Sequence, residues 1–306
     1  MLGEERLRER DLYPDSAGGI RMNRQIEREK SFHGKNWSKV HGGYFANPDV
    51  ASPLIRKVLE FANLSGANTI VDLGGGIGTL LSMLRTGVSD DTSLVNLDDS
   101  TIQLDVARAN GISCIHGSVN AFSRNDVGDK AAHFLFLMRS VLHYFGEDGL
   151  PTVLRHLYAQ IRPTEYFVHQ TASFRHQEDA DCLNDLYRMM RTNKWYPTVD
   201  ILCKCLRDAG WLVVEILPCA PLPLTSDELA QRYSLDQADI SHISDQLFRT
   251  PIASENILKK TDHGFCAFLH YWVYVCTPIA ASIPTKEEAD RNRTETPGAG
   301  CSLPRH

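Results

Sequence analysis

The chain of 306 residues is long enough to bury a full core, and its 42% hydrophobic and 23% charged residues are ordinary for a globular protein. A net charge of −6, with no dense stripe of lysine and arginine, argues against nucleic acid as a partner. The charged N-terminus is unlike a secretory signal, and no apolar run of about 18 residues suggests a membrane span, so we expect a cytoplasmic protein.

The eight cysteines are scattered, and none of them forms a Cys-x-x-Cys pair. Cys203 and Cys205 are two residues apart on an expected helix, where their side chains point in different directions. This pattern predicts reduced, mostly buried cysteines and no metal site.

Residues 1–45 form an N-terminal arm, charged and helix-prone at first and then rich in aromatic residues, histidine and glycine. The composition of the second part favours a helical and loop arm that closes as a lid over a ligand. Alternatively, Phe32, Trp37 and Phe45 serve only to anchor the arm to the core. The two interpretations are compatible.

A helix is expected to begin at Asn47, because a capping side chain is followed there by a proline at the first helical position. The β-branched, apolar run Thr69–Leu73 then predicts a buried parallel strand. Gly74, Gly75, Gly76 and Gly78 follow, and a helix begins after them. Strand, glycine loop and helix together predict a nucleotide-type site at the carboxyl end of the first strand.

Two details indicate which nucleotide binds. The dinucleotide fingerprint requires a third glycine where this chain has Thr79. Asp72, at the end of the strand, would repel a pyrophosphate but attract a cofactor that carries an ammonium and a sulfonium and no phosphate. The sequence therefore disfavours NAD and nucleotide sugars.

The second expected strand, Ser93–Asp98, ends 20 residues after Gly78 with a carboxylate that can accept both hydroxyls of a ribose. Asp99 is either a solvated turn residue or an adenosine contact. Further strands are expected at 112–115, 130–138, 165–171 and 211–217, and helices at 101–109, 149–161 and 198–210.

The connection between the expected strands six and seven is much longer than a plain hairpin needs. Residues 218–263 form an insertion between strands six and seven, with a rigid linker over Pro218–Pro223 and helices at 226–233 and 236–248. A single last strand is expected at 264–276, antiparallel to its neighbours. Residues 278–306 are expected to form a disordered tail.

Three segments resemble class I S-adenosylmethionine (SAM) dependent methyltransferases. Asp72-x-Gly74-x-Gly76-x-Gly78 resembles their motif I, and Ser140-Val-Leu-His-Tyr-Phe145 resembles the segment after the fourth strand in the small-molecule enzymes. Leu206-Arg-Asp-Ala-Gly-Trp211 is also typical. The resemblance covers roughly residues 45–217 and the last strand. It departs from the family at Ser118, where an acid usually binds adenine, although a hydroxyl also accepts hydrogen bonds.

The resemblance implies an α/β, Rossmann-like, doubly wound sheet of seven strands, mostly parallel with an antiparallel last strand, in a domain spanning 46–277. It also implies SAM as the cofactor. The residues expected to bind it are Asp72, Gly74, Gly75, Gly76, Gly78, Asp98, Asp99, Ser118, Val119, Arg139 and Ser140. Arg139 could instead pair with an anionic acceptor or face solvent.

His143 is the candidate catalytic base, because its place after the fourth strand implies that it faces the methyl group. Alternatively, it is a structural histidine, and catalysis depends on proximity alone. The residues expected to contact the acceptor are His41, Tyr44, His143, Tyr144, His169, Trp195 and Tyr196. Alternatively, His41, Tyr44, Trp195 and Tyr196 each serve only in packing.

The sequence thus predicts a methyltransferase acting on an O or N atom of a small molecule, such as an aromatic or secondary metabolite. The alternative is a SAM-binding protein of the same fold without methyl transfer, namely a cyclase or a binding module. A homodimer is compatible with the insertion, and no nucleic-acid or membrane partner is expected.

Overall fold

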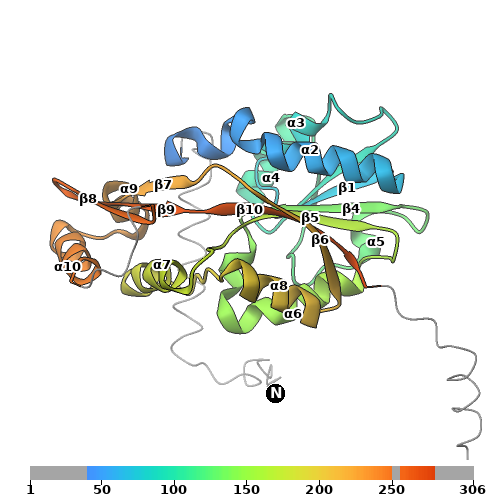
Figure 1. Ribbon diagram of the computed structural model, residues 1–306. Coiled ribbons are helices and arrows are strands. Elements are labelled where there is room, and N and C mark those ends of the chain that lie inside the picture. The colour runs from blue at the N-terminus through green and yellow to red at the C-terminus, as the bar shows by residue number, and fades with distance from the viewer. Residues whose placement is uncertain (1–39, 250–255, 280–306) are drawn as a thin grey trace, which may run out of the picture.

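The computed structural model describes residues 40–249 and 256–279 (Figure 1). Most of the predicted N-terminal arm and of the predicted tail therefore lie outside the described residues. Within those ranges, no helix combines the length and the apolarity that crossing a membrane requires.

A seven-stranded sheet forms the centre of the protein, with the strand order β3-β2-β1-β4-β5-β10-β6. Strands β1 to β5 are parallel, and β10 runs antiparallel to both of its neighbours, as predicted. The strands are β1 (Thr69–Leu73), β2 (Ser93–Asp98), β3 (Ser113–His116), β4 (Phe134–Arg139), β5 (Tyr166–Ala172), β6 (Trp211–Pro218) and β10 (Tyr271–Pro278). The Rossmann-like architecture inferred from the sequence is confirmed.

Helices cover both faces of this sheet (Figure 1). One face carries α2 (Pro48–Ser65), α3 (Thr79–Leu84) and α4 (Thr101–Ala109), and the other carries α5 (Arg124–Val127), α6 (Gly146–Ala159) and α8 (Val199–Asp208). Because both faces are covered, β1 and β4 are buried along their whole length, which explains their continuous apolar sequences.

The predicted start of α2 is confirmed. The Asn47 side chain accepts a hydrogen bond from the backbone N–H of Asp49 at 2.9 Å, and Pro48 occupies the first helical position. The helix ends at Gly66, whose φ of 69° lies in the left-handed region.

Two other boundaries differ from the prediction. The fourth strand begins at Phe134 rather than at residue 130. The short 3₁₀ helix η2 (Leu142–Phe145) leads directly into α6, which therefore begins at Gly146 rather than at Gly149. Of the seven cysteines in the described ranges only Cys182 and Cys276 are buried, so the prediction of mostly buried cysteines is wrong.

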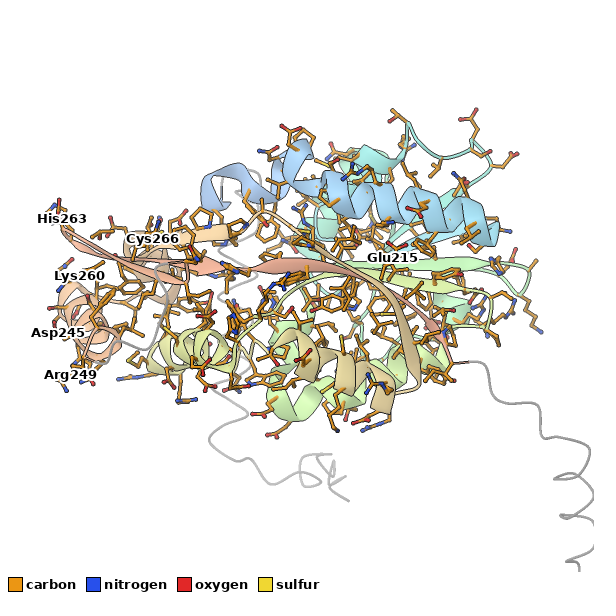
Figure 2. All side chains as sticks on the ribbon, in the orientation of Figure 1. Glu215, Asp245, Arg249, Lys260, His263 and Cys266 are labelled. Atoms are coloured by element: carbon orange, nitrogen blue, oxygen red, sulfur yellow. The ribbon has the colours of Figure 1, made fainter. Side chains whose placement is uncertain are left out.

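A second sheet of three antiparallel strands, in the order β7-β9-β8, extends beyond the carboxyl end of the central strands (Figure 1). Its strands are β7 (Leu222–Thr225), β8 (Leu258–Thr261) and β9 (Gly264–Leu269). The chain forms the helices α9 (Ser226–Tyr233) and α10 (Gln237–Leu247) between β7 and β8. Its far end is exposed and charged, and carries Asp245, Arg249, Lys260 and His263 (Figure 2).

The prediction of one last strand over 264–276 is wrong. The chain makes two strands separated by His270: β9 pairs in the small sheet, and β10 pairs in the central sheet. Both strands are apolar because each is buried against its own core, so His270 is the only polar residue that marks the division in the sequence. The predicted linker over 218–223 is also wrong, because β7 begins at Leu222 and pairs with β9.

The η1 segment (Val40–Ala46) and α7 (Gln177–Met189) join the two sheets. A core cluster contains Phe45 from the first, Leu183 from the second, and Leu224 and Phe265 from the small sheet. The insertion is therefore packed against the rest of the chain through a shared hydrophobic core.

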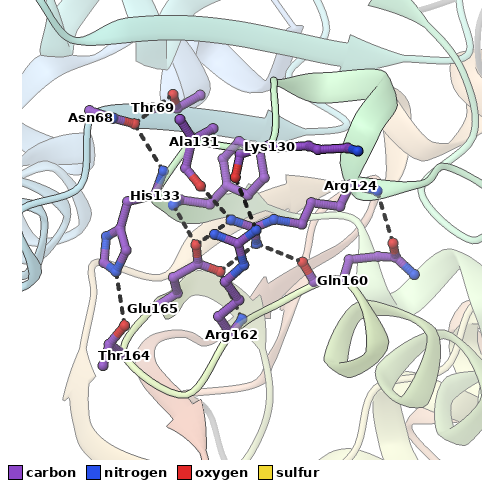
Figure 3. Close-up of polar contacts among 12 residues, drawn as sticks. Asn68, Thr69, Arg124, Lys130, Ala131, His133, Gln160, Arg162, Thr164 and Glu165 are labelled. Carbon is purple, nitrogen blue, oxygen red and sulfur yellow. Dashed lines mark hydrogen bonds and ion pairs between the residues drawn. The ribbon is translucent and has the colours of Figure 1, made fainter.

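A buried ion pair lies at the opposite end of the sheet, between β4 and β5 (Figure 3). The Glu165 carboxylate is fully buried and accepts two hydrogen bonds from the Arg124 guanidinium, each of 2.6 Å. It also accepts the backbone N–H groups of Phe134 and Arg162, each at 2.8 Å. One carboxylate thus connects α5, β4 and the turn before β5.

We expect Glu165→Gln to lower the free energy of unfolding by about 3 kcal/mol, because it leaves the Arg124 charge without its buried partner. Urea unfolding would measure the change. The control is Asp105→Asn in the exposed Arg108–Asp105 pair, with an expected change of less than about 0.5 kcal/mol. Equal effects of the two substitutions would contradict a structural role for the buried pair.

Candidate functional site

The glycine loop after β1 brings backbone close to side chains of its neighbours. Gly74 has a φ of 79°, and a Cβ there would lie 2.7 Å from the Val141 side chain. A Cβ at Gly75 would lie 2.6 Å from the carboxyl carbon of Asp72. Larger residues would therefore fill the space beside the Asp72 carboxylate.

Asp72 is 1% exposed, and neither carboxylate oxygen has a hydrogen-bond partner among the described residues. Burial, followed by the nearby charge of Asp98, raises the pKa of Asp72 to about 7, while Arg139 acts in the opposite direction. A buried carboxylate in this state is suited to receive a cationic ligand.

Asp98 ends β2 beside the same loop. One carboxylate oxygen accepts the backbone N–H of Gly76 at 2.9 Å, and the other accepts that of Ser100 at 2.8 Å. The Asn96 side chain donates to the Gly76 carbonyl at 2.8 Å. Asp99, the next residue, is exposed.

Arg139 ends β4 on the other side of the Asp72 carboxylate. Its guanidinium lies over the Phe45 ring, 5.0 Å from the centroid, and Nη1 donates to the Phe45 carbonyl at 3.0 Å. Nε and Nη2 are buried and have no hydrogen-bond partner in the part of the chain that the structure describes. Burial lowers the pKa of Arg139 from its ordinary value.

Ser140 follows with a φ of 60°, a conformation that non-glycine residues rarely adopt. Its N–H donates to the Gln170 carbonyl at 2.9 Å, and its hydroxyl lies 2.7 Å from that of Tyr271. Burial raises the pKa of Tyr271 to about 12, so this phenol stays protonated at neutral pH. These hydrogen bonds stabilise the turn that the chain makes at the end of β4.

Ser118 and Val119 lie in the loop after β3. Val119 is buried in the core, whereas Ser118 is partly exposed and its hydroxyl donates to the Asn120 side chain at 2.7 Å. The carboxyl ends of β1 to β4 thus carry every residue predicted to bind the cofactor.

A pocket lies between this edge of the sheet and the insertion. The side chains that line it are His41, Phe45, Ser140, His143, Tyr144, Tyr187, Lys194, Tyr196, Leu222, Leu224, Arg232, Leu269 and Tyr271. Four of the predicted acceptor residues are among them, namely His41, His143, Tyr144 and Tyr196. Ser140 lines the same pocket, so the cofactor residues and the acceptor residues adjoin.

His143 is 5% exposed and lies between two aromatic rings. Its centroid is 5.2 Å from that of Tyr196, in a stacked arrangement, and 4.2 Å from that of Tyr144. Its carbonyl accepts the backbone N–H of Trp195 at 3.2 Å. The loop after α7 therefore fixes the position of this histidine.

Three predicted acceptor residues are not among those lining the pocket. His169 is fully buried in the central sheet between Phe167 and Tyr274, and burial lowers its pKa to about 3. Its Nδ1 lies 2.7 Å from the Thr171 hydroxyl, so this histidine has a structural place. Side chains alternate between the two faces of β5. The His169 side chain lies with Phe167 on the face that packs against α6 and α8, away from the carboxyl edge.

Trp195 packs against the core of the central sheet, and Tyr44 packs beside the pocket without lining it. The Tyr44 hydroxyl donates to the Ala220 carbonyl at 2.6 Å. Tyr44 therefore joins the end of the N-terminal arm to the start of the insertion.

Lys194, Arg232 and Tyr271 line the pocket but were missed from the sequence. Arg232 lies three residues after Leu229 on the buried face of α9, and a cation on an apolar helix face is a recognisable signal. Tyr271 is the first residue of β10. Because β10 runs antiparallel to β5, Tyr271 lies beside the carboxyl end of β5. Lys194 stands beside the predicted Trp195 and Tyr196.

No protein-family model matches the sequence, and no curated protein matches it. Solved structures do match. A candidate methyltransferase from Bacillus halodurans superposes with a TM-score of 0.60 at 16% identity, over 74% of this chain and 99% of the other. The YcgJ protein of Bacillus subtilis gives 0.57 at 12% identity, over 74% and 98%.

A SAM-dependent methyltransferase from Geobacter sulfurreducens, solved with S-adenosylhomocysteine, gives a TM-score of 0.47 at 15% identity, over 84% of this chain and 98% of the other. At the level of the fold, the resemblance found in the sequence is confirmed: this chain has the Rossmann-like fold of the class I methyltransferases.

Proposed function

We propose that the protein is a SAM-dependent methyltransferase that transfers a methyl group to an oxygen or nitrogen atom of a small molecule. The Asp72 carboxylate and the nearby Arg139 guanidinium carry this proposal. A buried carboxylate and a buried guanidinium lie at one glycine loop, and each has polar atoms without a hydrogen-bond partner among the described residues. The ammonium and carboxylate of an amino acid complement such a pair.

The other residues of the edge suit the rest of this cofactor. Asp98 ends β2 beside the glycine loop, where its carboxylate would accept the two hydroxyls of a ribose. Ser118 and Val119, in the loop after β3, would contact an adenine ring. SAM, when bound, supplies an electrophilic methyl group on a sulfonium.

The acceptor would bind in the adjoining pocket, which is lined by Ser140, a predicted cofactor residue, and by His143 three residues further along the chain. Aromatic walls exclude water and orient the acceptor, which supplies the proximity that methyl transfer needs. If the acceptor atom is a hydroxyl, His143 would take its proton as a general base. The stacking of His143 on Tyr196 would hold its ring in position.

Calorimetric titration of the purified protein with SAM and with NAD tests the cofactor. Formation of S-adenosylhomocysteine in the presence of a panel of phenols, carboxylic acids and amines tests the transfer. Binding of SAM with methyl transfer supports the proposal, and tight binding of NAD would overturn it. Binding of SAM without transfer to any acceptor would favour the binding protein of the same fold.

We expect the dissociation constant of S-adenosylhomocysteine to rise as the pH falls from 8 to 6. The pKa of Asp72 in the ligand-free protein is about 7, so acidification neutralises the carboxylate that would hold the ammonium. The rise approaches about tenfold per pH unit below that value.

The Asp72→Asn variant should bind at least about tenfold more weakly at pH 8 and show a flatter pH profile. Asp90→Asn, at an exposed position, is the matched control. Calorimetry across pH measures both. An unchanged pH profile in the Asp72→Asn variant would contradict the role of this carboxylate.

We expect His143→Gln to lower the rate of methyl transfer to a hydroxyl acceptor by at least roughly 100-fold while the affinity for S-adenosylhomocysteine stays unchanged. His133→Gln, at the opposite end of the sheet, is the control. The measurement is single-turnover transfer with an acceptor that the panel identifies. Turnover within about twofold of wild type would show that proximity alone is sufficient.

A further inference from the structure

Gln170 is a buried polar side chain outside both the glycine loop and the pocket. It lies on β5, near the carboxyl end of the strand, and is 0% exposed. Neither Oε1 nor Nε2 of its carboxamide has a hydrogen-bond partner in the part of the chain that the structure describes. An amide buried in this way destabilises the ligand-free protein, so its presence needs a reason other than the stability of the fold.

The alternation of side chains along the strands places Gln170 on the same face of the sheet as Asp72 and Arg139. Each of the three lies two residues after an apolar member of the core cluster that the sheet shares with α2. These apolar residues are Ile70, Leu137 and Val168. Because residues two apart on a strand point to the same side, all three polar side chains face α2.

Gln170 is the direct neighbour of Arg139 across the sheet. The Cα atoms of the two residues are partners in the parallel pairing of β4 with β5. Asp72 lies on the other side of Arg139, on β1, and the guanidinium is close enough to lower the pKa of the carboxyl group against the larger effect of burial. A carboxylate, a guanidinium and a carboxamide therefore follow one another across β1, β4 and β5.

The three side chains share one property. Both oxygens of Asp72, Nε and Nη2 of Arg139, and both polar atoms of the Gln170 amide are buried without a hydrogen-bond partner among the described residues. The Cys219 thiol lies beside Gln170; burial raises the pKa of this thiol, and the amide acts in the opposite direction. Since a thiol is only a weak donor and acceptor, it does not replace a partner for the amide.

This row of groups is complementary to the two charges of an α-amino acid. The carboxylate of Asp72 suits an ammonium, and the N–H groups of Arg139 suit a carboxylate. One guanidinium nitrogen, Nη1, already donates to the Phe45 carbonyl at 3.0 Å. The Gln170 amide adds a neutral donor beside the guanidinium, where the second oxygen of a bound carboxylate would need one.

We propose that the Gln170 carboxamide binds, beside Arg139, the carboxylate at the amino-acid end of the cofactor. The inference rests on the methyltransferase function proposed above and adds a further cofactor-binding residue to the same site. A neutral amide would fix the direction of the carboxylate without adding a charge beside Asp72. The unpartnered amide of the ligand-free protein would then gain its hydrogen bond when the cofactor binds.

The test uses two ligands that differ only in this carboxylate, S-adenosylhomocysteine and its decarboxylated analogue S-adenosyl-3-thiopropylamine. Each is titrated by calorimetry into the full-length protein at pH 8. We expect the wild-type protein to bind S-adenosylhomocysteine at least about tenfold more tightly than the analogue. This comparison needs no variant, and therefore does not depend on how a variant folds.

Gln170→Met removes the amide and keeps the length of the side chain. We expect binding of S-adenosylhomocysteine to weaken by about tenfold, and binding of the analogue to stay within about twofold of wild type. Because the substitution removes a buried group without partners, the midpoint of urea unfolding of the ligand-free protein should stay the same or rise. An amide with a structural role would give a lower midpoint instead.

Gln160→Met is the matched control, because the Gln160 amide is hydrogen-bonded on both sides. Its Oε1 accepts the backbone N–H of Arg124 at 2.9 Å, and its Nε2 donates to the His156 carbonyl at 3.4 Å. This substitution should lower the midpoint of urea unfolding and leave the preference for S-adenosylhomocysteine as in the wild-type protein.

Equal binding of the two ligands to the wild-type protein would overturn the inference. A Gln170→Met variant that fails to fold, weakens both ligands equally or keeps the wild-type preference would also overturn it. The proposed function is tested separately by S-adenosylhomocysteine and the wild-type protein. If these do not bind each other, the proposed function fails as well, whereas binding with a preference that survives Gln170→Met refutes only the role of Gln170.

Discussion

The position of Asp72 at the end of β1 is the constraint on which the site depends. Its carboxylate is enclosed by the glycine loop and by Asn96, and the described residues give it no hydrogen-bond donor. Folding raises its pKa from 3.8 to about 7, so the unfolded state holds fewer protons between these values. The charge therefore lowers the stability of the ligand-free protein as pH rises from about 4 to 7, and a bound cation would offset this loss.

Arg139 connects this carboxylate to the rest of the site. Its guanidinium contacts Phe45, just before α2, while the next residue, Ser140, is hydrogen-bonded to Tyr271 at the start of β10. The two sides of the proposed reaction, cofactor and acceptor, are thus joined by adjacent residues of one strand end. A shift of this short segment would alter both sides together.

Much of the fold follows from the sequence because each parallel strand is a short apolar run followed by a polar residue or glycine. The same regularity places Asp72, Asp98 and Arg139 at one edge of the sheet, since parallel strands end on the same side. The cofactor half of the candidate site was therefore predictable from motif and spacing, whereas the assigned roles remain predictions.

The acceptor half was less predictable, for two physical reasons. His169 lies on a strand whose side chains are buried on both faces of the sheet, so its sequence context does not reveal which side it faces. Arg232 reaches the pocket only because the insertion folds back onto α7, a contact between segments far apart in the sequence. The division between β9 and β10 is marked in the sequence only by His270, a single polar residue in an otherwise apolar run.

That division has a consequence for how the protein could change over time. One continuous stretch of chain is shared by two sheets, so Leu269 lines the pocket from the small sheet and Tyr271 lines it from the large one. Four of the lining residues, Leu222, Leu224, Arg232 and Leu269, belong to the small sheet and its helices, whereas the residues that would hold the cofactor lie at the ends of the central strands. Substitutions in the small sheet could therefore reshape one wall of the pocket without touching the residues that would hold the cofactor.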